Sequence, residues 1–250
     1  ARDNSLEKLL LLGEPEAVVA VVHANGITNE IARRAWWCAP NSDNARCLLE
    51  SAEVAQGYMG QELAKFLVEF LPFEESSKAL MKSVRLILQP DLIDEKTKLD
   101  IWNRGKRRNT FYVGFIKQCP ESIPVKVKAH SMFDKVSQYA SFHQYINKLS
   151  SVFSAQGQAT LDAIITVLKK PNDQDVAVEI FNAIGNHFNA ETLENFRWRN
   201  ISELDEHAEI ILNSLTSEIN SLTSDWPDAK SHLYAVIYLS MVSETLLDPV

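Results

Sequence analysis

The stretch LAKFLVEFL, residues 63–71, decides the fold class, because its apolar side chains recur with the period of an α-helix. Counting from Leu63, apolar residues stand at positions i, i+3, i+4, i+7 and i+8. This spacing places them along one stripe of a helix, which can pack against a neighbouring element. Pro72 follows directly and is a stop signal. The stretch therefore predicts an amphipathic helix that ends near residue 71.

The same spacing recurs along most of the chain and predicts an all-α protein. No stretch alternates apolar and polar residues between hairpin turns, as the strands of an antiparallel sheet would. The other predicted helix faces are Ala45, Leu48, Leu49 and Ala52; Leu80, Val84, Ile87 and Leu88; Leu161, Ile164, Ile165 and Leu168; Ala177, Phe181, Ile184 and Phe188; and Leu204, Ala208, Ile211, Leu215 and Leu222.

Turn-forming residues divide the chain into two helical regions. Six of the eight glycines lie before residue 120, several of them just after an apolar run, where helices end. The segments PEAVVAVVHANGIT (15–28) and SDNARCLLESAEV (42–54) share an order of acidic, alanine and aliphatic positions at an offset of about 28 residues. We therefore expect short HEAT-like or leucine-rich-variant-like repeats over 1–120. A longer helical bundle is expected over 121–250, either separate from the first region or continuous with it.

A Ser-rich and Gln-rich segment, SSVFSAQGQAT at residues 150–160, is expected to be a connection before the last helices.

Charge is distributed unevenly along the chain. The net charge is −8, with 25 basic and 33 acidic side chains. Residues 76–135 contain 13 basic and 6 acidic side chains, a net charge of +7, between flanks of −6 and −9. Such a basic segment favours a surface for phosphates or for an acidic partner, unless the flanks neutralise it in the fold. The sequence leaves the oligomeric state open.

Cysteine usage and hydropathy indicate a cytoplasmic protein. No apolar run approaches the roughly 18 residues that a membrane-spanning helix needs, so no membrane association is expected. The three cysteines, Cys38, Cys47 and Cys119, form no CxxC pair and have no histidine at zinc-ligand spacing. We expect them to be reduced and mostly buried.

The segment EIARRAWWCAPNSDNARCLLES, residues 30–51, is the chemically densest part of the chain. On a helix ended by Pro40, Cys38 is expected to point into the core. One of the adjacent Trp36 and Trp37 is expected to pack inward and the other against a neighbouring helix, since they differ by about 100°. Ser42 or Asp43 is expected to cap the next helix. The arginines of the segment, Arg33, Arg34 and Arg46, are expected to stack on an indole or to pair with acids. They are also candidate residues of a partner-binding surface.

A second candidate segment, IWNRGKRRNTFYVGF at residues 101–115, interleaves cations with aromatic residues. The basic side chains could neutralise phosphates while Trp102, Phe111 and Tyr112 stack on bases, which would suit single-stranded RNA. They could equally bind an anionic protein partner, or form a solvated corner above buried aromatics. The candidate binding residues of this segment are Trp102, Arg104, Lys106, Arg107 and Arg108.

No residue pattern supports catalysis, a cofactor or a metal. The chain has no GxSxG, P-loop, GxGxxG or HExxH motif. In ISELDEHAEIIL, the position three residues before His207 is Leu204 rather than the glutamate of a di-iron site. The remaining route to chemistry is a cysteine-dependent sulfur carrier or redox enzyme that uses Cys38, Cys47 or Cys119, which would require an exposed thiol with a lowered pKa.

Three segments carry a family resemblance: ITNEIARRAWWCAPNSDNARCLLES (27–51), LAKFLVEFLPFEE (63–75) and SVRLILQPDLID (83–94). Over roughly residues 9–120 the chain resembles DsrS-like proteins, cytoplasmic accessory proteins of the dissimilatory sulfite reductase system. The resemblance implies a role in the expression or assembly of sulfur-oxidation enzymes and supplies no catalytic residues. The leading hypothesis is a non-enzymatic binding or regulatory accessory protein with a protein partner, with an RNA-binding regulator and a cysteine-dependent enzyme as alternatives.

Overall fold

The computed structural model describes residues 2–188, 201–215 and 226–241, and all the regular elements in that part of the chain are helices. The prediction of an all-α protein is confirmed. Clustering of contacts divides the chain into two compact units, residues 1–118 and residues 119–250. The division falls two residues before the boundary expected from the sequence. None of the described helices combines the length and the apolar character that crossing a bilayer requires.

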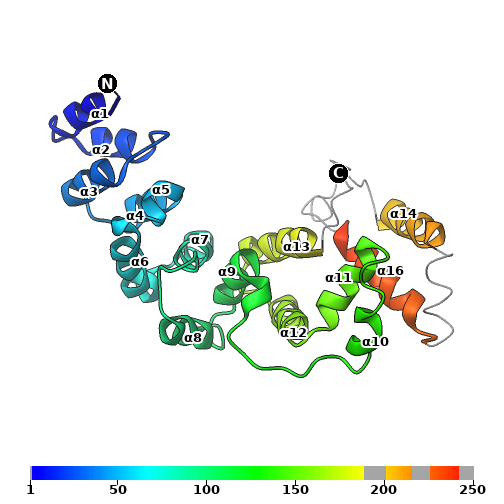
Figure 1. Ribbon diagram of the computed structural model, residues 1–250. Coiled ribbons are helices and arrows are strands. Elements are labelled where there is room, and N and C mark those ends of the chain that lie inside the picture. The colour runs from blue at the N-terminus through cyan, green and yellow to red at the C-terminus, as the bar shows by residue number, and fades with distance from the viewer. Residues whose placement is uncertain (1, 189–200, 216–225, 242–250) are drawn as a thin grey trace. The chain divides into compact units, whose positions relative to one another are not determined.

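The first unit is a succession of short helices in which most helices contact the next one along the chain (Figure 1). For example, α4 contacts α2, α3, α5, α6 and α7. The HEAT-like or leucine-rich-variant-like repeat stays a prediction, since neighbour contacts alone do not identify a repeat type. The helices of this unit are α1 (Arg2–Leu10), α2 (Pro15–Val22), α3 (Asn29–Cys38), α4 (Ser42–Leu49), α5 (Ala52–Ala55), α6 (Tyr58–Phe70), the 3-10 helix η1 (Leu71–Phe73), α7 (Ser77–Ile87), α8 (Glu95–Arg104) and α9 (Thr110–Gln118).

Polar side chains directly before the helices set where several of them start. Asn41 Oδ1 accepts from the Asn44 amide at 2.9 Å and caps α4. The cap is therefore Asn41 and not Ser42 or Asp43, because the backbone of Asn41 is extended and the helix begins at the next residue, Ser42. Asp94 caps α8 in the same way, with Oδ1 2.8 Å from the Thr97 amide.

The apolar faces of the first unit form its core. Leu63 and Leu67 of the opening stretch are buried on α6, as are Leu48 on α4 and Leu80 on α7. α7 and α9 approach each other closely, since a Cβ on Gly114 would lie 2.5 Å from Val84 Cγ1. Glycine is therefore the residue that lets these two helices touch.

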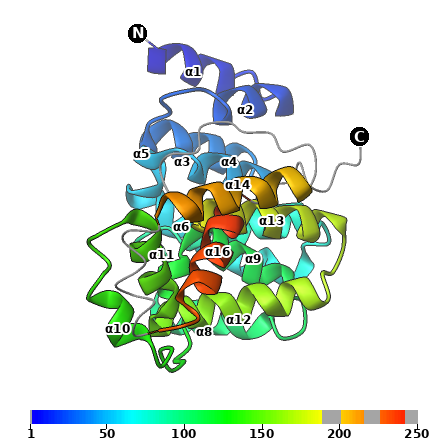
Figure 2. The same cartoon turned by 90° about the vertical axis from the view of Figure 1, so that its right-hand side faces the viewer.

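The second unit is built around α16, which contacts α11, α13 and α14 (Figure 2). Leu233 and Ile237 of α16 are fully buried in it. The elements of this unit are the 3-10 helix η2 (Pro120–Ser122), α10 (Phe133–Ser137), α11 (Gln144–Phe153), α12 (Ala155–Lys169), α13 (Gln174–Phe188), α14 (Ile201–Ser214) and α16 (Ala229–Ser240).

Two expectations about the second unit are wrong. The segment 150–160 is not a connection: it lies in α11 and α12, separated only by Ser154, whose hydroxyl accepts from the Gly157 amide at 3.0 Å. The predicted face of α12 is rotated as well, since Ile165 and Leu168 are both 40% exposed. The buried face has the same spacing one residue earlier and consists of Thr160, Ala163, Ile164 and Val167. Leu222 of the last predicted face lies outside the described residues.

Candidate functional site

Each of the four predicted cations has a different environment. Arg104 is the last residue of α8, and Lys106, Arg107 and Arg108 lie in the turn before α9. α8 ends at Arg104, and Gly105 follows where the ring of Tyr112 approaches the backbone. A Cβ on Gly105 would lie 2.2 Å from that ring, so only glycine allows α9 to fold back this closely.

The aromatic residues of this corner are buried and do not belong to a binding surface. Trp102 is 6% exposed, and its ring centroid lies 4.4 Å from that of Tyr112 and 5.1 Å from that of Phe115. Phe111 and Tyr112 are also buried, and this burial raises the pKa of the Tyr112 hydroxyl. The prediction that Trp102 contributes to partner binding is wrong, because α8 and α9 pack against each other through these rings.

Arg108 is a structural residue. Its Nη1 donates to the Glu74 carbonyl at 2.6 Å, and its Nη2 donates to the Glu75 carbonyl at 2.8 Å and to Ser77 Oγ at 3.3 Å. These bonds join the start of α9 to the segment between η1 and α7. The guanidinium is therefore occupied and does not act as a free cation in the predicted surface.

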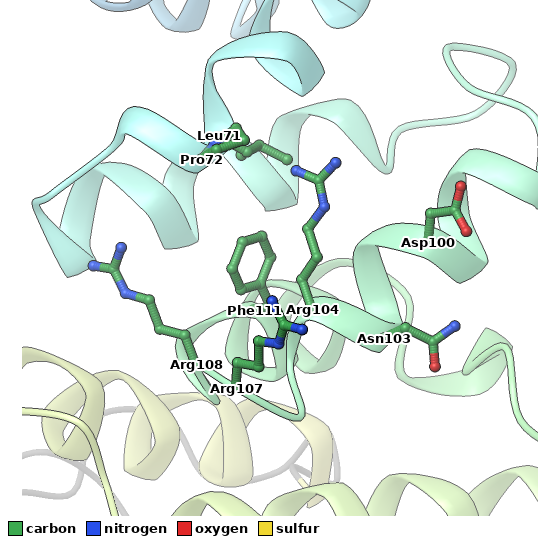
Figure 3. Close-up of a pocket in the computed structure, with 8 residues that line it drawn as sticks. All are labelled: Leu71, Pro72, Asp100, Asn103, Arg104, Arg107, Arg108 and Phe111. Carbon is green, nitrogen blue, oxygen red and sulfur yellow. The ribbon is translucent and has the colours of Figure 1, made fainter.

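Beside Arg108 lies an open pocket of about 550 Å³, which we call the arginine pocket (Figure 3). Its apolar residues come from η1 and α9, and its polar residues come from α8 and the following turn. Sequence reasoning found the arginines but missed the residues from η1, which are about 30 positions away in the sequence. The lining residues are Leu71, Pro72, Asp100, Asn103, Arg104, Arg107, Arg108 and Phe111.

Arg104 is the unusual residue of the arginine pocket. Its side chain extends toward Leu71 and Pro72, as Figure 3 shows. Its Nη1 is buried and has no hydrogen-bond partner in the described part of the chain. An unsatisfied buried donor destabilises a protein by about 1–3 kcal/mol, and more when the group is charged. This arrangement therefore lowers the stability of the free protein.

Arg107 and Lys106 complete the basic corner and are both exposed. Arg107 lines the arginine pocket, whereas Lys106 does not. Neither side chain forms an ion pair with any residue that the structure describes. Arg104 and Arg107 thus line the pocket together with the hydrogen-bonded Arg108, and the neighbouring Lys106 adds charge outside it.

The arginines of α3 are already paired with acids. Glu30 lies 2.7 Å from Arg33 Nη2 and 2.8 Å from Arg34 Nε, and hydrogen bonds from these two arginines lower the pKa of Glu30 to about 2. Arg34 also lies 2.9 Å from Glu7 of α1. Pairing with Glu30 raises the pKa of both arginines. This pairing is one of the two outcomes expected from the sequence, and it leaves little unbalanced charge for a partner.

Arg46 is not part of a surface, contrary to prediction. It is 7% exposed, and it lies 2.6 Å from Asp43 Oδ1, 2.8 Å from Glu74 Oε2 and 3.1 Å from Ser83 Oγ. The reason is its position on α4, which packs against α6 and α7. Arg46 therefore stabilises the interior of the unit.

The thiols are more accessible than expected. Cys38 is exposed, while Cys47 and Cys119 are partly exposed, so the prediction of mostly buried cysteines is wrong. The buried face of α3 is centred between Ile31 and Trp36. At about 100° per residue, Cys38 points roughly 90° away from the centre of that face.

Cys47 has a histidine neighbour that the sequence did not indicate. His23 Nδ1 lies 3.2 Å from Cys47 Sγ, across 24 positions of sequence. Burial and the nearby Glu50 nevertheless raise the pKa of the Cys47 thiol. A raised pKa disfavours the thiolate and so works against a nucleophilic or sulfur-carrying role for this residue.

A second pocket, of about 490 Å³, lies between α1 and α3. Trp36 packs inward, its ring centroid 4.8 Å from that of Phe66, as expected for one of the two tryptophans. Trp37 is 83% exposed instead of packing on a neighbouring helix, because it projects from the opposite side of α3. The pocket is lined by Glu7, Leu10, Leu11, Arg33, Arg34, Trp37 and Cys38.

Comparison of the chain with protein-family models, with curated proteins and with solved structures finds no match.

Proposed function

We propose that this chain is a non-enzymatic accessory protein of the cytoplasm that binds an anionic protein partner through the arginine pocket. The observation that carries the proposal is the position of Arg104 and Arg107 in one open pocket, with Lys106 exposed beside it. No acid pairs with Arg107 or Lys106 among the described residues, so their charge is available to a partner. A rim of unpaired cations steers association with an anionic surface.

Binding RNA through the same corner has less support. Sequence-tolerant binding of single strands needs aromatic side chains that stack on bases. The four aromatic residues of this segment, Trp102, Phe111, Tyr112 and Phe115, are all buried. A protein partner requires only the exposed cations and the apolar residues of the pocket.

The link to dissimilatory sulfur metabolism remains a prediction from the resemblance to DsrS-like proteins. It concerns the identity of the partner and not the chemistry of the pocket. A partner that belongs to the sulfur-oxidation enzymes would support it, and an unrelated partner would contradict it.

The test is affinity purification of the tagged protein from extract of its native cells, with and without nuclease. The variant Arg104→Glu/Lys106→Glu/Arg107→Glu reverses the basic corner but retains Arg108, which the fold needs. A matched control reverses three exposed lysines elsewhere in the first unit: Lys65→Glu/Lys78→Glu/Lys96→Glu.

We expect a defined protein to co-purify with the parent chain and with the control, with or without nuclease, and to be lost from the corner variant. Equal loss from both variants would show general charge attraction and contradict the site. Release by nuclease would show that nucleic acid is the bridge and would favour the RNA-binding alternative.

A further inference from the structure

We infer that the arginine pocket binds a side-chain carboxylate, from a glutamate or aspartate in an acidic segment of the partner protein, between Arg104 and Arg107. This inference rests on the proposed function and adds the chemistry of the bound group.

One donor of the Arg104 guanidinium, Nη1, is unsatisfied. Buried charged donors in proteins are normally paired with an acceptor. Nη1 is buried and has no partner among the described residues, and Arg104 also lines a pocket that is open to solvent. An oxyanion in the pocket can accept from Nη1 once the Arg104 side chain turns toward it. This rotation breaks no hydrogen bond of Nη1, because the atom has no acceptor in the free protein.

The shape of the pocket is held by hydrogen bonds within the protein. The hydrogen bonds of Arg108 to the carbonyls of Glu74 and Glu75 hold the chain next to η1 against the start of α9. The pocket wall is therefore fixed before a ligand arrives, which reduces the entropy lost on binding. Arginine recognises a carboxylate through two parallel N–H donors, and Arg104 and Arg107 both line the cavity.

Apolar surface at the pocket favours a side-chain carboxylate over a free phosphate. Asp100 also lines the pocket and places a negative charge near the incoming group. A phosphate monoester carries a charge of about −1.5 to −2 at pH 7, so both its repulsion by Asp100 and its attraction by the arginines exceed those of a carboxylate, and charge alone does not distinguish the two. Pro72 is exposed and provides an apolar surface that suits the methylene groups of a glutamate, whereas Leu71 and Phe111 lie buried behind it.

The test uses isothermal titration calorimetry on the full chain at low salt. The probe is an acetylated hexapeptide of alternating glutamate and leucine, and the comparison probes are the same peptide with glutamine for glutamate, inorganic phosphate and a uridine oligonucleotide. The variants Arg104→Gln, Arg107→Gln and Lys106→Gln each remove one charge from the same corner, and only the first two remove a residue of the pocket.

We expect the acidic peptide to bind and the glutamine peptide not to bind. Arg104→Gln and Arg107→Gln should each weaken binding by about tenfold or more, the size of a charge-assisted hydrogen bond, while Lys106→Gln should change it by about twofold or less. Thermal unfolding of the ligand-free Arg104→Gln protein should be unchanged or shifted upward, because the deleted donor has no partner to lose.

Three results would overturn the inference: no binding of the acidic peptide by the parent chain, an equal loss in all three variants, or tighter binding of phosphate or of the oligonucleotide with the same dependence on Arg104. The proposed function fails separately. If a protein co-purifies through the basic corner but the peptide does not bind, the surface is correct and the carboxylate assignment is wrong. If neither is observed, both proposals fail.

Discussion

Two arginines of the first unit show opposite ways of burying a guanidinium. Arg46 is surrounded by Asp43, Glu74 and Ser83, all within hydrogen-bonding distance, so its charge is compensated inside the protein. Arg104 has a buried donor and no such partner. A compensated charge stabilises the fold only weakly against an apolar alternative, but removing one partner of it is strongly destabilising. An uncompensated donor is destabilising as it stands, which makes Arg104 a candidate for function and Arg46 a candidate for structure.

His187 gives the second unit a pH-dependent stability. It is 8% exposed on α13, and its ring centroid lies 5.0 Å from that of Phe188. Burial, and next the charge of Lys148, lower the pKa of His187 from 6.5 to about 4. The native state therefore favours the neutral ring, and the unfolded chain binds the proton first as the pH falls.

We expect the free energy of unfolding to decrease between pH 6.5 and about pH 4, by up to about 1.4 kcal/mol per pH unit, because of His187 alone. The stability is fully present above pH 6.5. Denaturant unfolding across this range for the parent chain and for His187→Gln measures the contribution as a difference, so that carboxylate titrations cancel. If the free energies of unfolding of the two proteins change with pH in parallel, the pKa of His187 is the same in the folded and the unfolded chain, and the prediction is wrong.

At the scale of elements, the contact of α7 with α9 determines how the arginine pocket is supported. α9 carries Phe111 of the pocket, and α7 follows the segment that Arg108 holds. The close approach depends on Gly114, where an added Cβ would also lie 2.6 Å from Val84 Cβ. Backbone-to-side-chain contact of this kind cannot be relieved by rotating one side chain.

We expect Gly114→Ala to destabilise the protein by about 1–3 kcal/mol, as overpacked core substitutions do. In an exposed helix the same change is stabilising by about 0.5–1 kcal/mol, so the sign of the effect reports the contact. Chemical denaturation followed by circular dichroism gives the value. A variant as stable as the parent, or more stable, would mean that α7 and α9 can separate without loss.

Helices were the predictable part of this structure, and their orientation was less so. Local periodicity is enough to identify α6, and Leu63, Leu67 and Leu71 are buried where the spacing placed them, but Phe70 of the same predicted face is 43% exposed. On α12 the spacing fits two adjacent faces, and the choice depends on a distant residue: the hydroxyl of Thr160 donates to the Pro120 carbonyl. A face fixed by a contact across 40 positions is not encoded in the local pattern.

The site shows the same limit more strongly. The sequence identified the cluster of cations around the turn after α8. No pattern in the neighbouring sequence predicts that Arg108 donates to backbone carbonyls while Lys106 is exposed to solvent. The partners of Arg108 lie 33 and 34 positions away, and Leu71 and Pro72 are equally remote. Composition therefore predicted a basic corner, and tertiary packing divided it into one structural arginine and two that face a pocket.

At the scale of the whole molecule, the two units differ in charge. Residues 1–118 contain 16 basic and 16 acidic side chains, whereas residues 119–250 contain 9 and 17, which add up to the 25 and 33 of the chain. The first unit is thus neutral and the second has a net charge of −8. Four acids of the first unit, Glu7, Glu30, Asp43 and Glu74, pair with Arg33, Arg34 and Arg46, and no acid of the described residues pairs with Arg107 or Lys106.

We expect the fragment 1–118 to fold alone. It is of ordinary domain size, and its own apolar residues form a core, with Leu48, Leu63, Leu80 and Ile101 all fully buried. Circular dichroism should show a helical protein with a cooperative thermal transition, and the fragment should retain the binding properties of the arginine pocket. A fragment that melts without cooperativity would show that the second unit is needed for the first to fold.

The neighbour-to-neighbour contacts of the first unit also bear on the order of events during synthesis. Most of its helices contact the next helix along the chain, and α7 contacts α9, the next helix but one. Contacts between residues that are close in sequence form quickly, since little chain entropy is lost in closing short loops. The growing polypeptide can therefore acquire native structure helix by helix as it leaves the ribosome, so that the arginine pocket is complete before the acidic second unit has been translated.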